Sequence, residues 1–468
     1  MEWYWILIAL LGSTLALMFI GFPVGVAFIL VNTVAAFIIY GRFGSLDANM
    51  EAGIYQLTDN AFANMSIFAI VPIPMFLLMG ELFFHTGLAN RMFNAVENLM
   101  GSTPARLSYV TVAGGTAFAT LSGSSMGSTA LLGTLMVPEM AKRGYKKSMS
   151  IGPILGTGGL AMLIPPSALA VLLGTLAEID IGRLLIGGIV PGLILATMYA
   201  VYIFLRATYD PSVAPIYEVE YIPWSARLCL FLTDVVPMIS IIVMVILLIM
   251  FGVATPSESA AYGSLGVIIL SILYLWLMPL LRGERDQAHK FWLKFSDSLW
   301  KSMWGAARVT IIALMILFGS SLFSNVLAAS GASVALIEWV TSFDVSGFVM
   351  LLIMFGILLL LGMFMDQLAM MLLTVPIFFP IIVGFDFGLS AEQQVIWFAV
   401  IMLLAMEISF TTPPFGLLLF VMQGVAPPGT KFSEICLAAI PFMACAMFLV
   451  ALIIFFPPIV TWLPFLGP

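Results

Sequence analysis

The chain has 468 residues, of which 62% are hydrophobic and only 9% are charged. Soluble globular domains contain about 25% charged residues, so this composition excludes a soluble protein and predicts one embedded in the lipid bilayer. The formal net charge of −7 does not set its orientation, because membrane topology follows the positions of Lys and Arg.

No motif in the sequence indicates catalysis, ATP hydrolysis or a transition-metal site. Cys229, Cys436 and Cys445 lie in or beside apolar runs and match no metal-binding spacing. A phosphate-binding loop of the G-x-x-x-x-G-K-[ST] type is absent from the sequence, as is a nucleophile–base arrangement. We therefore expect neither an enzyme nor a nucleic-acid-binding protein, and no organic cofactor.

Apolar runs long enough to cross a bilayer recur along the chain and predict an all-α polytopic membrane protein. The elements expected in the first half, 1–207, are scaffold spans within 4–85, a hairpin at 105–141, a broken helix at 148–178 and a span at 184–206. The elements expected in the second half, 231–468, are scaffold spans within 231–328, a hairpin at 346–383, a broken helix at 394–426 and a span at 437–463. Residues 208–230 are expected to form a cytoplasmic linker, and the polar stretch at 280–302 also reads as a linker.

The stretch LSGSSMGSTALLG (121–133) places hydroxyls and glycines where a membrane helix normally carries leucine. Basic residues flank this region at Arg106 and in KRGYKK (142–147), and the positive-inside rule places both edges in the cytoplasm. The arms between these edges have about 15 residues each, which is too few for a full crossing. We therefore predict a re-entrant hairpin that enters from the cytoplasm, with SGSS (122–125) at its tip.

A second hairpin is predicted to enter from the opposite side, with LGMFMDQ (361–367) at its tip. Its base, GFDFGLSAEQQ (384–394), is acidic and lacks Lys and Arg, so we expect it to face the periplasm. The same threading of the chain places the N-terminus in the periplasm.

The two halves of the chain align around their prolines. TLMVPEM (134–140) matches LLTVPIF (372–378), and IPPSA (164–168) matches TPPFG (412–416). Because the matching segments enter the membrane from opposite sides, the halves are predicted to be inverted-topology repeats. Such repeats, with discontinuous helices at the bilayer midplane, are typical of secondary transporters.

Two helix breaks carry clusters of oxygen ligands. Pro165 and Pro166 break one helix and free the carbonyls just upstream, and this break pairs with the serines of SGSS. Thr411 and Thr412 precede the paired prolines of the second break. Such oxygens suit Na⁺, and the half-helix N-termini that follow the breaks suit an anion. Close helix packing alone explains a single small-residue motif, whereas paired and inverted copies favour binding.

Three acidic residues lie at or near membrane depth. Asp366 is expected to be functional, with a helix cap at the hairpin turn as the alternative, and the two roles can coexist. Glu407 either makes a structural hydrogen bond or couples protons, and the sequence leaves both readings open. Glu81 ends an apolar span and is expected at the membrane interface.

These motifs resemble the large membrane subunit of the tripartite ATP-independent periplasmic (TRAP) transporters. The segments that carry the similarity are IVPIPMFLLMGELFFHTGLA (70–89), LSGSSMGSTALLGTLMVPEMAKRGYKK (121–147), MLIPPSALAVLLG (162–174), FGVATPSESAAYG (251–263) and SFTTPPFGLLLFVMQGVAPPG (409–429). The resemblance implies Na⁺-coupled uptake of a small organic acid anion, a carboxylate or sulfonate, across the bacterial inner membrane. It also implies a periplasmic binding protein that delivers the substrate and a small four-helix membrane subunit. The hairpins and broken helices would then move against a scaffold in an elevator mechanism.

The resemblance also implies site residues and at least two sodium ions. The expected sodium ligands are Ser122, Ser124, Gly159, Ile164 and Pro166 in one repeat, and Gly362, Thr411, Thr412, Pro414 and Gly416 in the other. The residues expected near the substrate are Ser125, Thr129, Ser167 and Asp366. The linkers at 208–228 and 280–302 look long for the family.

Two other hypotheses stand beside this one. A stand-alone sodium/dicarboxylate symporter of related inverted-hairpin architecture would need no binding protein. A membrane-embedded enzyme or a channel is the third hypothesis, and the missing catalytic arrangement disfavours the enzyme. The sequence does not name the substrate.

Overall fold

The computed structural model describes the chain as a bundle of helices. It covers residues 3–40, 54, 55, 58, 62, 68–101, 103–217, 223–281, 283, 285–342, 345–363, 365–413 and 416–466. No strand occurs within these residues. Six of the described helices are long and apolar enough to cross a membrane, or seven if the bent pair Pro72–His85 and Leu88–Met100 forms one span. The prediction of an all-α polytopic membrane protein is confirmed.

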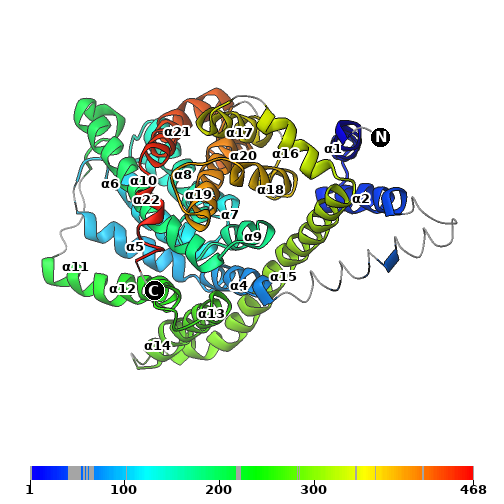
Figure 1. Cartoon of the computed structure of the whole chain (residues 1–468). Helices are drawn as coiled ribbons and strands as arrows, with labels where there is room; N and C mark the ends of the chain where they lie inside the picture. Colours follow the sequence, from blue (N-terminus) through cyan, green and yellow to red (C-terminus); the bar gives the residue numbers. More distant parts are fainter. Residues whose placement is uncertain are drawn as a thin grey trace.

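Figure 1 shows the helices in chain order. The first half contains α1 (Trp3–Phe19), α2 (Val24–Tyr40), α4 (Pro72–His85), α5 (Leu88–Met100), α6 (Arg106–Ser122), α7 (Ser125–Lys142), α8 (Lys147–Gly159), α9 (Ala168–Leu176) and α10 (Ile181–Tyr209). The second half contains α11 (Trp224–Leu230), α12 (Val236–Met250), α13 (Pro256–Ile272), α14 (Met278–Leu281), α15 (Arg285–Ala329), α16 (Ala332–Ser342), α17 (Gly347–Gly362), α18 (Gln367–Val383), α19 (Ala391–Phe410), α20 (Leu417–Val425), α21 (Phe432–Phe455) and α22 (Pro458–Thr461).

Two helical hairpins lie where the sequence places them. α6 packs against α7 with Gly123 and Ser124 at the turn, and α17 packs against α18 with its turn just before Gln367. Gly123 has φ +59°, a left-handed conformation that glycine adopts without strain, and this lets the chain reverse within two residues. The arms of 16 to 18 residues are shorter than the roughly 20 residues of a membrane crossing. Re-entry into the membrane stays a prediction.

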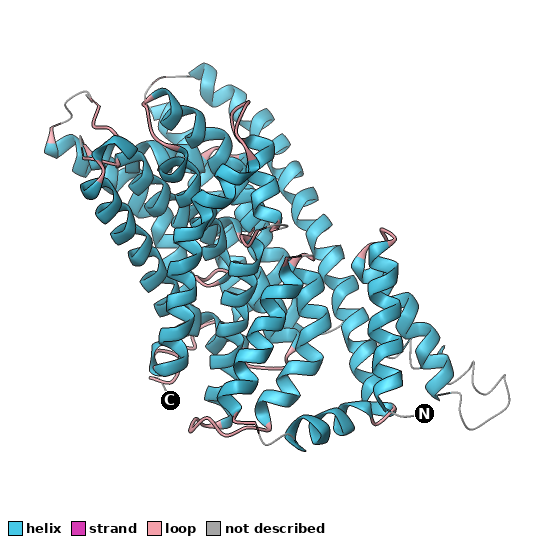
Figure 2. Cartoon of the chain, turned by 90° about the horizontal axis from the view of Figure 1, so that it is seen from above, coloured by secondary structure: helices cyan, strands magenta, loops and turns pink. Residues whose placement is uncertain are grey.

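Each hairpin is followed by a helix that breaks inside the protein. α8 ends at Gly159, a short 3₁₀ segment follows at Leu160–Met162, and α9 begins only at Ala168, after the paired prolines. α19 ends at Phe410 and α20 begins at Leu417. Figure 2 shows loop segments in the interior of the bundle, midway along the helices, in addition to those at its ends.

The stretch 280–302 differs from its prediction as a linker. Residues from Arg285 onward belong to α15, which continues for 45 residues to Ala329. No Gly or Pro interrupts 285–302, and the apolar Phe291 and Phe295 stand one turn apart, where both are buried and their rings stack. The charges in this stretch end the apolar run but not the helix. At 1.5 Å per residue α15 is about 68 Å long, so it extends well beyond a bilayer core.

Two other element boundaries also differ from prediction. The expected linker 208–230 ends in helix, because α11 continues through a π-helical turn into α12 as one helix, Trp224–Met250. The last span, expected at 437–463, ends earlier at Phe455, where two consecutive prolines cannot donate backbone hydrogen bonds and the short α22 follows.

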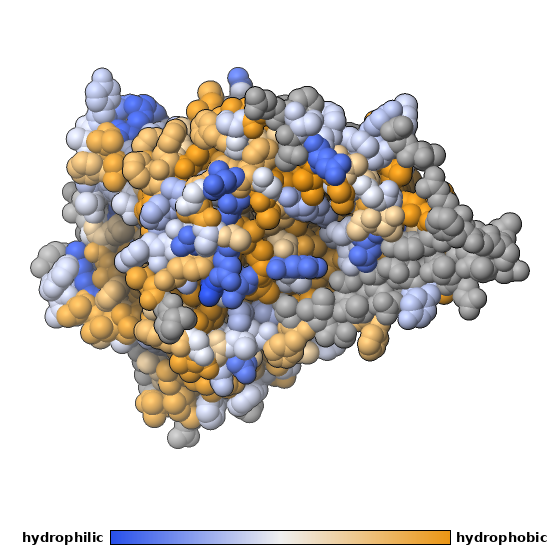
Figure 3. Space-filling model, viewed as in Figure 1, coloured by the Kyte–Doolittle hydropathy of each residue, from blue (hydrophilic) through white to orange (hydrophobic). Residues whose placement is uncertain are grey.

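One side of the molecule in Figure 1 is formed by α1, α2 and α16 together with part of α15, and these helices pack against one another. Hydrophilic and apolar side chains are mixed on the face shown in Figure 3. Many large apolar side chains remain exposed along the outside of the helices, among them Ile38, Phe204, Val243 and Phe448. A soluble protein avoids such extensive apolar exposure, whereas a bilayer accommodates it.

Glycines bring the broken helix of the first half against its neighbour. A methyl group added at Gly188 of α10 would collide with the backbone oxygen of Leu163, in the break before the prolines. By contrast, Gly356 of α17 has no neighbouring atom within 4 Å of such a methyl group. The two glycines are therefore a matched pair for testing how tightly the break is held.

We predict that Gly188→Ala destabilises the protein by about 1–3 kcal/mol, because backbone has to move to admit the methyl group. Gly356→Ala is expected to leave stability unchanged or raise it slightly, since alanine is the better helix former. Thermal unfolding of the purified variants in detergent measures both. Equal melting temperatures for the two variants would contradict this packing.

Candidate functional site

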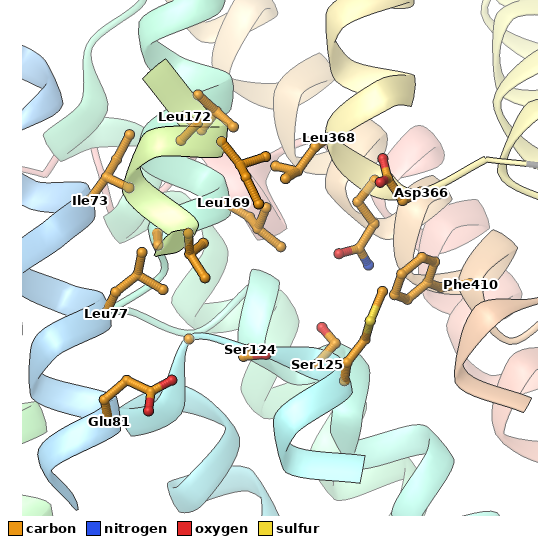
Figure 4. Close-up of a pocket in the computed structure, with 17 residues that line it drawn as sticks. Ile73, Leu77, Glu81, Ser124, Ser125, Leu169, Leu172, Asp366, Leu368 and Phe410 are labelled. Atoms are coloured by element: carbon orange, nitrogen blue, oxygen red, sulfur yellow. The ribbon is translucent and has the colours of Figure 1, made fainter. Parts of the chain in front are cut away.

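A cavity of about 230 Å³ lies at the tips of both hairpins (Figure 4). Ser124 and Ser125 line it from the first hairpin, and Asp366 and Gln367 line it from the second. The start of α9 and the ring of Phe410 at the end of α19 complete this side. The opposite wall comes from α4 and α15, which pack against each other. The cavity therefore lies between the two hairpins and the pair α4–α15.

Three helices begin beside this cavity, and each is capped by the side chain that precedes it. The capping contacts run from Gly127 N–H to Ser124 Oγ at 3.1 Å, from Ala170 N–H to Ser167 Oγ at 3.2 Å and from Ala369 N–H to Asp366 Oδ1 at 2.7 Å. A helix N-terminus carries roughly half a positive charge, so three of them near one cavity favour an anionic group. Among the described lining residues there is no Lys, Arg or His, whereas the carboxyl groups of Asp366 and Glu81 do line the wall, so the helix N-termini are the source of positive potential there.

Two polar side chains in the cavity wall each have a buried atom without a hydrogen-bond partner among the described residues. Ser125 is 3% exposed and Gln367 is 6% exposed, and the Ser125 Oγ and Gln367 Nε2 atoms are both unpaired. A buried polar group without a partner costs about 1–3 kcal/mol, so a ligand that pairs both groups gains affinity. Sequence reasoning named Ser125 but missed Gln367, although its place directly after Asp366 at the hairpin tip was a usable signal.

Asp366 fills the capping role that the sequence allowed, and it also lines the cavity. Its carboxylate caps α18 through the N–H of Ala369, and the residue also lines the cavity. Figure 4 shows Asp366 on the side of the cavity opposite Leu77 and Glu81. The cap is a finding, whereas contact with a substrate stays a prediction.

The second helix break exposes a compact group of oxygens. The hydroxyls of Thr411 and Thr412 both donate to the backbone oxygen of Ile408, at 3.0 and 2.7 Å. Because both hydroxyl protons are used in these hydrogen bonds, the lone pairs of the two hydroxyl oxygens can coordinate a cation. Gly416 donates its N–H to the backbone oxygen of Thr412 at 3.0 Å, and a methyl group at Gly416 would lie 2.7 Å from the oxygen of Phe410. Only glycine allows the loop to close this tightly.

The first helix break is buried, and its residues Ile164, Pro166 and Ser167 do not line the cavity. Ile164 and Pro166 are both buried in the break, and Ser167 is fully buried as the cap of α9. Thr129 is also fully buried and packs against Gly158 of α8, and its hydroxyl has no hydrogen-bond partner in the described part of the chain. Neither Thr129 nor Ser167 lines the 230 Å³ cavity, so the structure does not bring these two expected substrate residues to it.

Three of the remaining expected sodium residues lie at the ends of helices. Gly159 ends α8 and packs directly against the side chain of Glu407. Gly362 ends α17 and packs equally closely against the hydroxyl group of Ser409 in α19. Ser122 is the last residue of α6.

The side chain of Ser122 and the whole of Pro414 lie outside the described residues. Their predicted part in sodium binding is therefore untested by the structure.

Glu81 lies in the cavity wall, and its expected place at the membrane interface stays a prediction. It lines the cavity from α4, near Ser124 in Figure 4, and its carboxylate is 3.2 Å from the imidazole of His85 one turn later. The sequence showed only that an apolar run ends here. The position facing the hairpin depends on the packing of α4 against α6 and α9, which sequence patterns do not reveal.

Glu407 is buried in the helix that leads to the second break. It is 3% exposed, and the hydroxyl of Tyr199 in α10 donates to its Oε1 at 3.3 Å. Its other oxygen, Oε2, has no hydrogen-bond partner among the residues that the structure describes. The structural hydrogen bond that the sequence allowed is therefore present, and it satisfies only half of the carboxyl group.

The comparison with known protein families identifies the chain. The profile described as "Tripartite ATP-independent periplasmic transporter, DctM component" matches residues 11–459. The chain belongs to this family. The expected TRAP large membrane subunit is thereby confirmed, and the chain is a transporter component rather than an enzyme.

Individual relatives cover most of the chain. It is 29% identical over 415 residues to the C4-dicarboxylate TRAP transporter large permease protein DctM of Pseudomonas aeruginosa, across 88% of this chain and 90% of that protein. It is 27% identical over 405 residues to the isethionate TRAP transporter permease protein DctMQ of Oleidesulfovibrio alaskensis, across 85% of this chain and 58% of that protein. The ectoine TRAP transporter large permease protein TeaC of Halomonas elongata is 25% identical over 454 residues, across 97% of this chain and 98% of that protein.

Solved structures resemble the chain in fold. The Alcanivorax borkumensis YdaH transporter superposes with a TM-score of 0.56 and 14% identity, covering 87% of this chain and 90% of that one. The Neisseria gonorrhoeae MtrF efflux pump gives a TM-score of 0.56 and 13% identity, covering 92% and 94%. At this identity the likeness concerns the helical architecture alone.

Two substitutions at Asp366 test how much its capping of α18 contributes to stability. We predict that Asp366→Ala lowers stability by about 1 kcal/mol, because α18 loses its capping acceptor. Asp366→Asn keeps a capping oxygen and is expected to unfold at nearly the wild-type temperature. Thermal unfolding in detergent tests both variants, and an Asn variant as unstable as the Ala variant would show that the cap is not what Asp366 contributes.

Proposed function

We propose that this chain is the permease of a Na⁺-coupled TRAP transporter that takes up a small organic acid anion across the bacterial inner membrane. The observation that carries the proposal is the cavity at the two hairpin tips, beside three helix N-termini and next to an oxygen-rich helix break. Discontinuous helices with this arrangement bind anionic substrates at half-helix N-termini and coupling ions at freed carbonyls.

Ser125 and Gln367 are proposed to bind the substrate anion. Their unpaired Oγ and Nε2 atoms can donate to carboxylate or sulfonate oxygens, and the N-termini of α7, α9 and α18 stabilise the negative charge. The names of relatives include C4-dicarboxylate, isethionate and ectoine transporters. All three are small acids or zwitterions, which fits a cavity of about 230 Å³.

Sodium ions are proposed to bind at the two helix breaks. Thr411, Thr412 and Gly416 supply hydroxyl and backbone oxygens at the second break, where both hydroxyl protons are already used within the protein. At the first break we propose Ser122 and Ser124 with the backbone of Gly159, Ile164 and Pro166. Because a bound ion neutralises oxygens that point toward one another, sodium would stabilise the tips in the geometry that receives the anion.

The two walls of the cavity support an elevator mechanism. The hairpins and broken helices would form the mobile part, and α4 and α15 would belong to the scaffold across which the cavity moves. The proposed two inverted repeats, 1–207 and 231–468, supply one hairpin and one broken helix each.

The basic residues at the base of the first hairpin support the proposal that this end of the hairpin faces the cytoplasm. Lys146 and Lys147 lie beyond α7, where Lys146 pairs with Asp210 at 3.3 Å and Lys147 pairs with Glu434 at 2.6 Å. The hydroxyl of Ser212, together with Lys146, holds the pKa of Asp210 below its ordinary value, so this carboxylate stays charged beside the lysine. With this basic face in the cytoplasm, the N-terminus is proposed to lie in the periplasm.

Two partner proteins are part of the proposal. A periplasmic binding protein would deliver the substrate to the outer face, and a small four-helix membrane subunit would join the scaffold. The relative named DctMQ is longer than this chain, which spans 58% of its length. A small subunit fused to the permease in that relative would account for its extra length.

We predict that Na⁺ stabilises the purified chain and that Thr412→Ala weakens this effect. A ligand at about 100 times its dissociation constant adds about 2.7 kcal/mol per site to the stability of the folded state. Melting temperatures measured in NaCl and in choline chloride at equal ionic strength give the shift. Thr197→Ala is the control, because the Thr197 hydroxyl makes the same bond to a carbonyl four residues earlier but lies exposed on α10. A full sodium shift in Thr412→Ala would place the ion elsewhere, and no shift in the wild type would overturn sodium coupling.

A further inference from the structure

Helix α15 carries one charge inside its apolar part, and neither the proposed anion site nor the proposed sodium sites use it. Between Lys301 and Glu338 the sequence has a single charged residue, Arg308. The helix Phe291–Ala329 is long and apolar enough to cross a membrane, so Arg308 lies in a segment where a charge is costly. Because arginine keeps its charge in proteins, this residue needs an anionic partner or contact with water.

Arg308 lies at the edge of the cavity between the hairpin tips and the pair α4–α15. Val309 and Ile312, its close neighbours on α15, line that cavity. Around the axis of an α-helix, Arg308 lies about 40° from Ile312, whereas Ile311 lies about 100° from it. Arg308 is exposed and is not itself part of the cavity wall. It therefore flanks the cavity at the same level of α15.

The charge of Arg308 is not balanced by another described residue. Within the part of the chain that the structure describes, its side chain makes no ion pair and no hydrogen bond. A carboxylate does reach α15 one turn earlier, because a methyl group added at Gly305 would lie 2.9 Å from Glu81 Oε2. Glu81 pairs with His85 instead, at 3.2 Å. The guanidinium group is therefore available to an anion that is not part of this chain.

The chemistry of the guanidinium group suits the acid group of the proposed substrate. Arginine presents five N–H donors in a planar fork that matches the two oxygens of a carboxylate. The described cavity wall offers neutral donors at Ser125 and Gln367, and it contains the carboxyl groups of Asp366 and Glu81 but no basic side chain. Arg308 would supply, from the rim, the full positive charge that the wall lacks.

We propose that Arg308 is the contact of α15 with the substrate anion, and that it binds the acid group at the cytoplasmic rim of the cavity as the hairpin tips move inward. The positive-inside rule places the end of α15 that carries Lys294 and Lys301 in the cytoplasm, and Arg308 lies toward that end from Val309 and Ile312. Tips that carry the cavity inward along α15 therefore pass Arg308. The inference rests on the proposed function, because it takes the cavity as the anion site.

Titration of the purified full-length chain with small acids tests the proposal. The probes are isethionate and succinate, a sulfonate and a C4-dicarboxylate, which are the acid classes in the names of relatives. Melting temperatures are measured at constant Na⁺ concentration and ionic strength, with chloride as the reference anion. We expect an acid to raise the wild-type melting temperature, and Arg308→Gln to raise its apparent dissociation constant about tenfold or more. Arg308→Lys keeps the charge without the fork, so its affinity is expected to lie between those of the wild type and the Gln variant.

Lys301→Gln is the matched control. Lys301 precedes Arg308 by two turns on the same side of α15, is exposed, and pairs with Asp297 at 2.5 Å. The substitution removes the same amount of positive charge from the helix without approaching the cavity. Because solvent and salt screen an exposed charge at that distance, the affinity for the acid is expected to stay close to that of the wild type.

Cysteine labelling tests whether position 308 faces water or lipid. In a background with alanine in place of the three native cysteines, Arg308→Cys is placed in lipid nanodiscs, where both membrane faces are accessible. It is treated with sulfonatoethyl methanethiosulfonate, a water-soluble reagent that carries a sulfonate. Thiols react as thiolates, which form in water and not in lipid, so we expect Arg308→Cys to be modified. Ile311→Cys replaces an exposed side chain farther from the cavity around α15, and we expect it to stay unmodified.

Each contrary result has a definite meaning. An unmodified Arg308→Cys would show that the residue faces lipid and would overturn the proposal. An acid affinity that is unchanged in Arg308→Gln, or that falls equally in Lys301→Gln, would overturn it while the proposed function stands. If neither acid shifts the wild-type melting temperature, then the cavity is not the anion site, and the proposed function fails together with this inference.

Discussion

The need to satisfy backbone amides away from bulk water shapes the centre of this molecule. Helices α7, α9, α18 and α20 begin inside the protein, where every unpaired N–H group is costly. Ser124, Ser167 and Asp366 each accept one such N–H, and Gly416 closes its turn through the backbone. The chain thereby holds three positive helix ends beside one cavity without any basic side chain in its described wall. An anion can be recognised there through backbone charge and neutral donors alone.

The same breaks require unusually close contact between helices, and glycines provide it. Gly188 packs against the backbone of the first break, Gly362 packs against Ser409, and Gly159 packs against Glu407. These contacts tie each hairpin and broken helix to its neighbours, and α4 and α15 line the other side of the cavity while also packing against α6, α9 and α18. Such a division suits a mobile unit that carries the site past a fixed wall, as in the proposed elevator.

Much of this arrangement could be predicted from the sequence because it follows from local chemistry. Paired prolines mark each helix break. Glycine and serine mark the tip of the first hairpin, and basic residues mark the base of that hairpin. The sequence failed where tertiary packing decides. The charged stretch after Arg285 ends an apolar run, yet the helix continues as α15 because nothing in it disfavours helix. The sequence did not show that Glu81 lines the cavity, and Gln367 was overlooked beside Asp366 because its unpaired amide nitrogen is visible only in three dimensions.

The proposed function depends on sodium ions that bind at the helix breaks beside the proposed anion-binding cavity. An electron-cryomicroscopy structure of the chain in NaCl, compared with one in choline chloride, tests this most directly. The account predicts ion density enclosed by Thr411, Thr412 and Gly416, with a second density at the first break, and both absent in choline chloride. Identical maps in the two salts, with the oxygens of the breaks contacting only protein atoms or water, would contradict it.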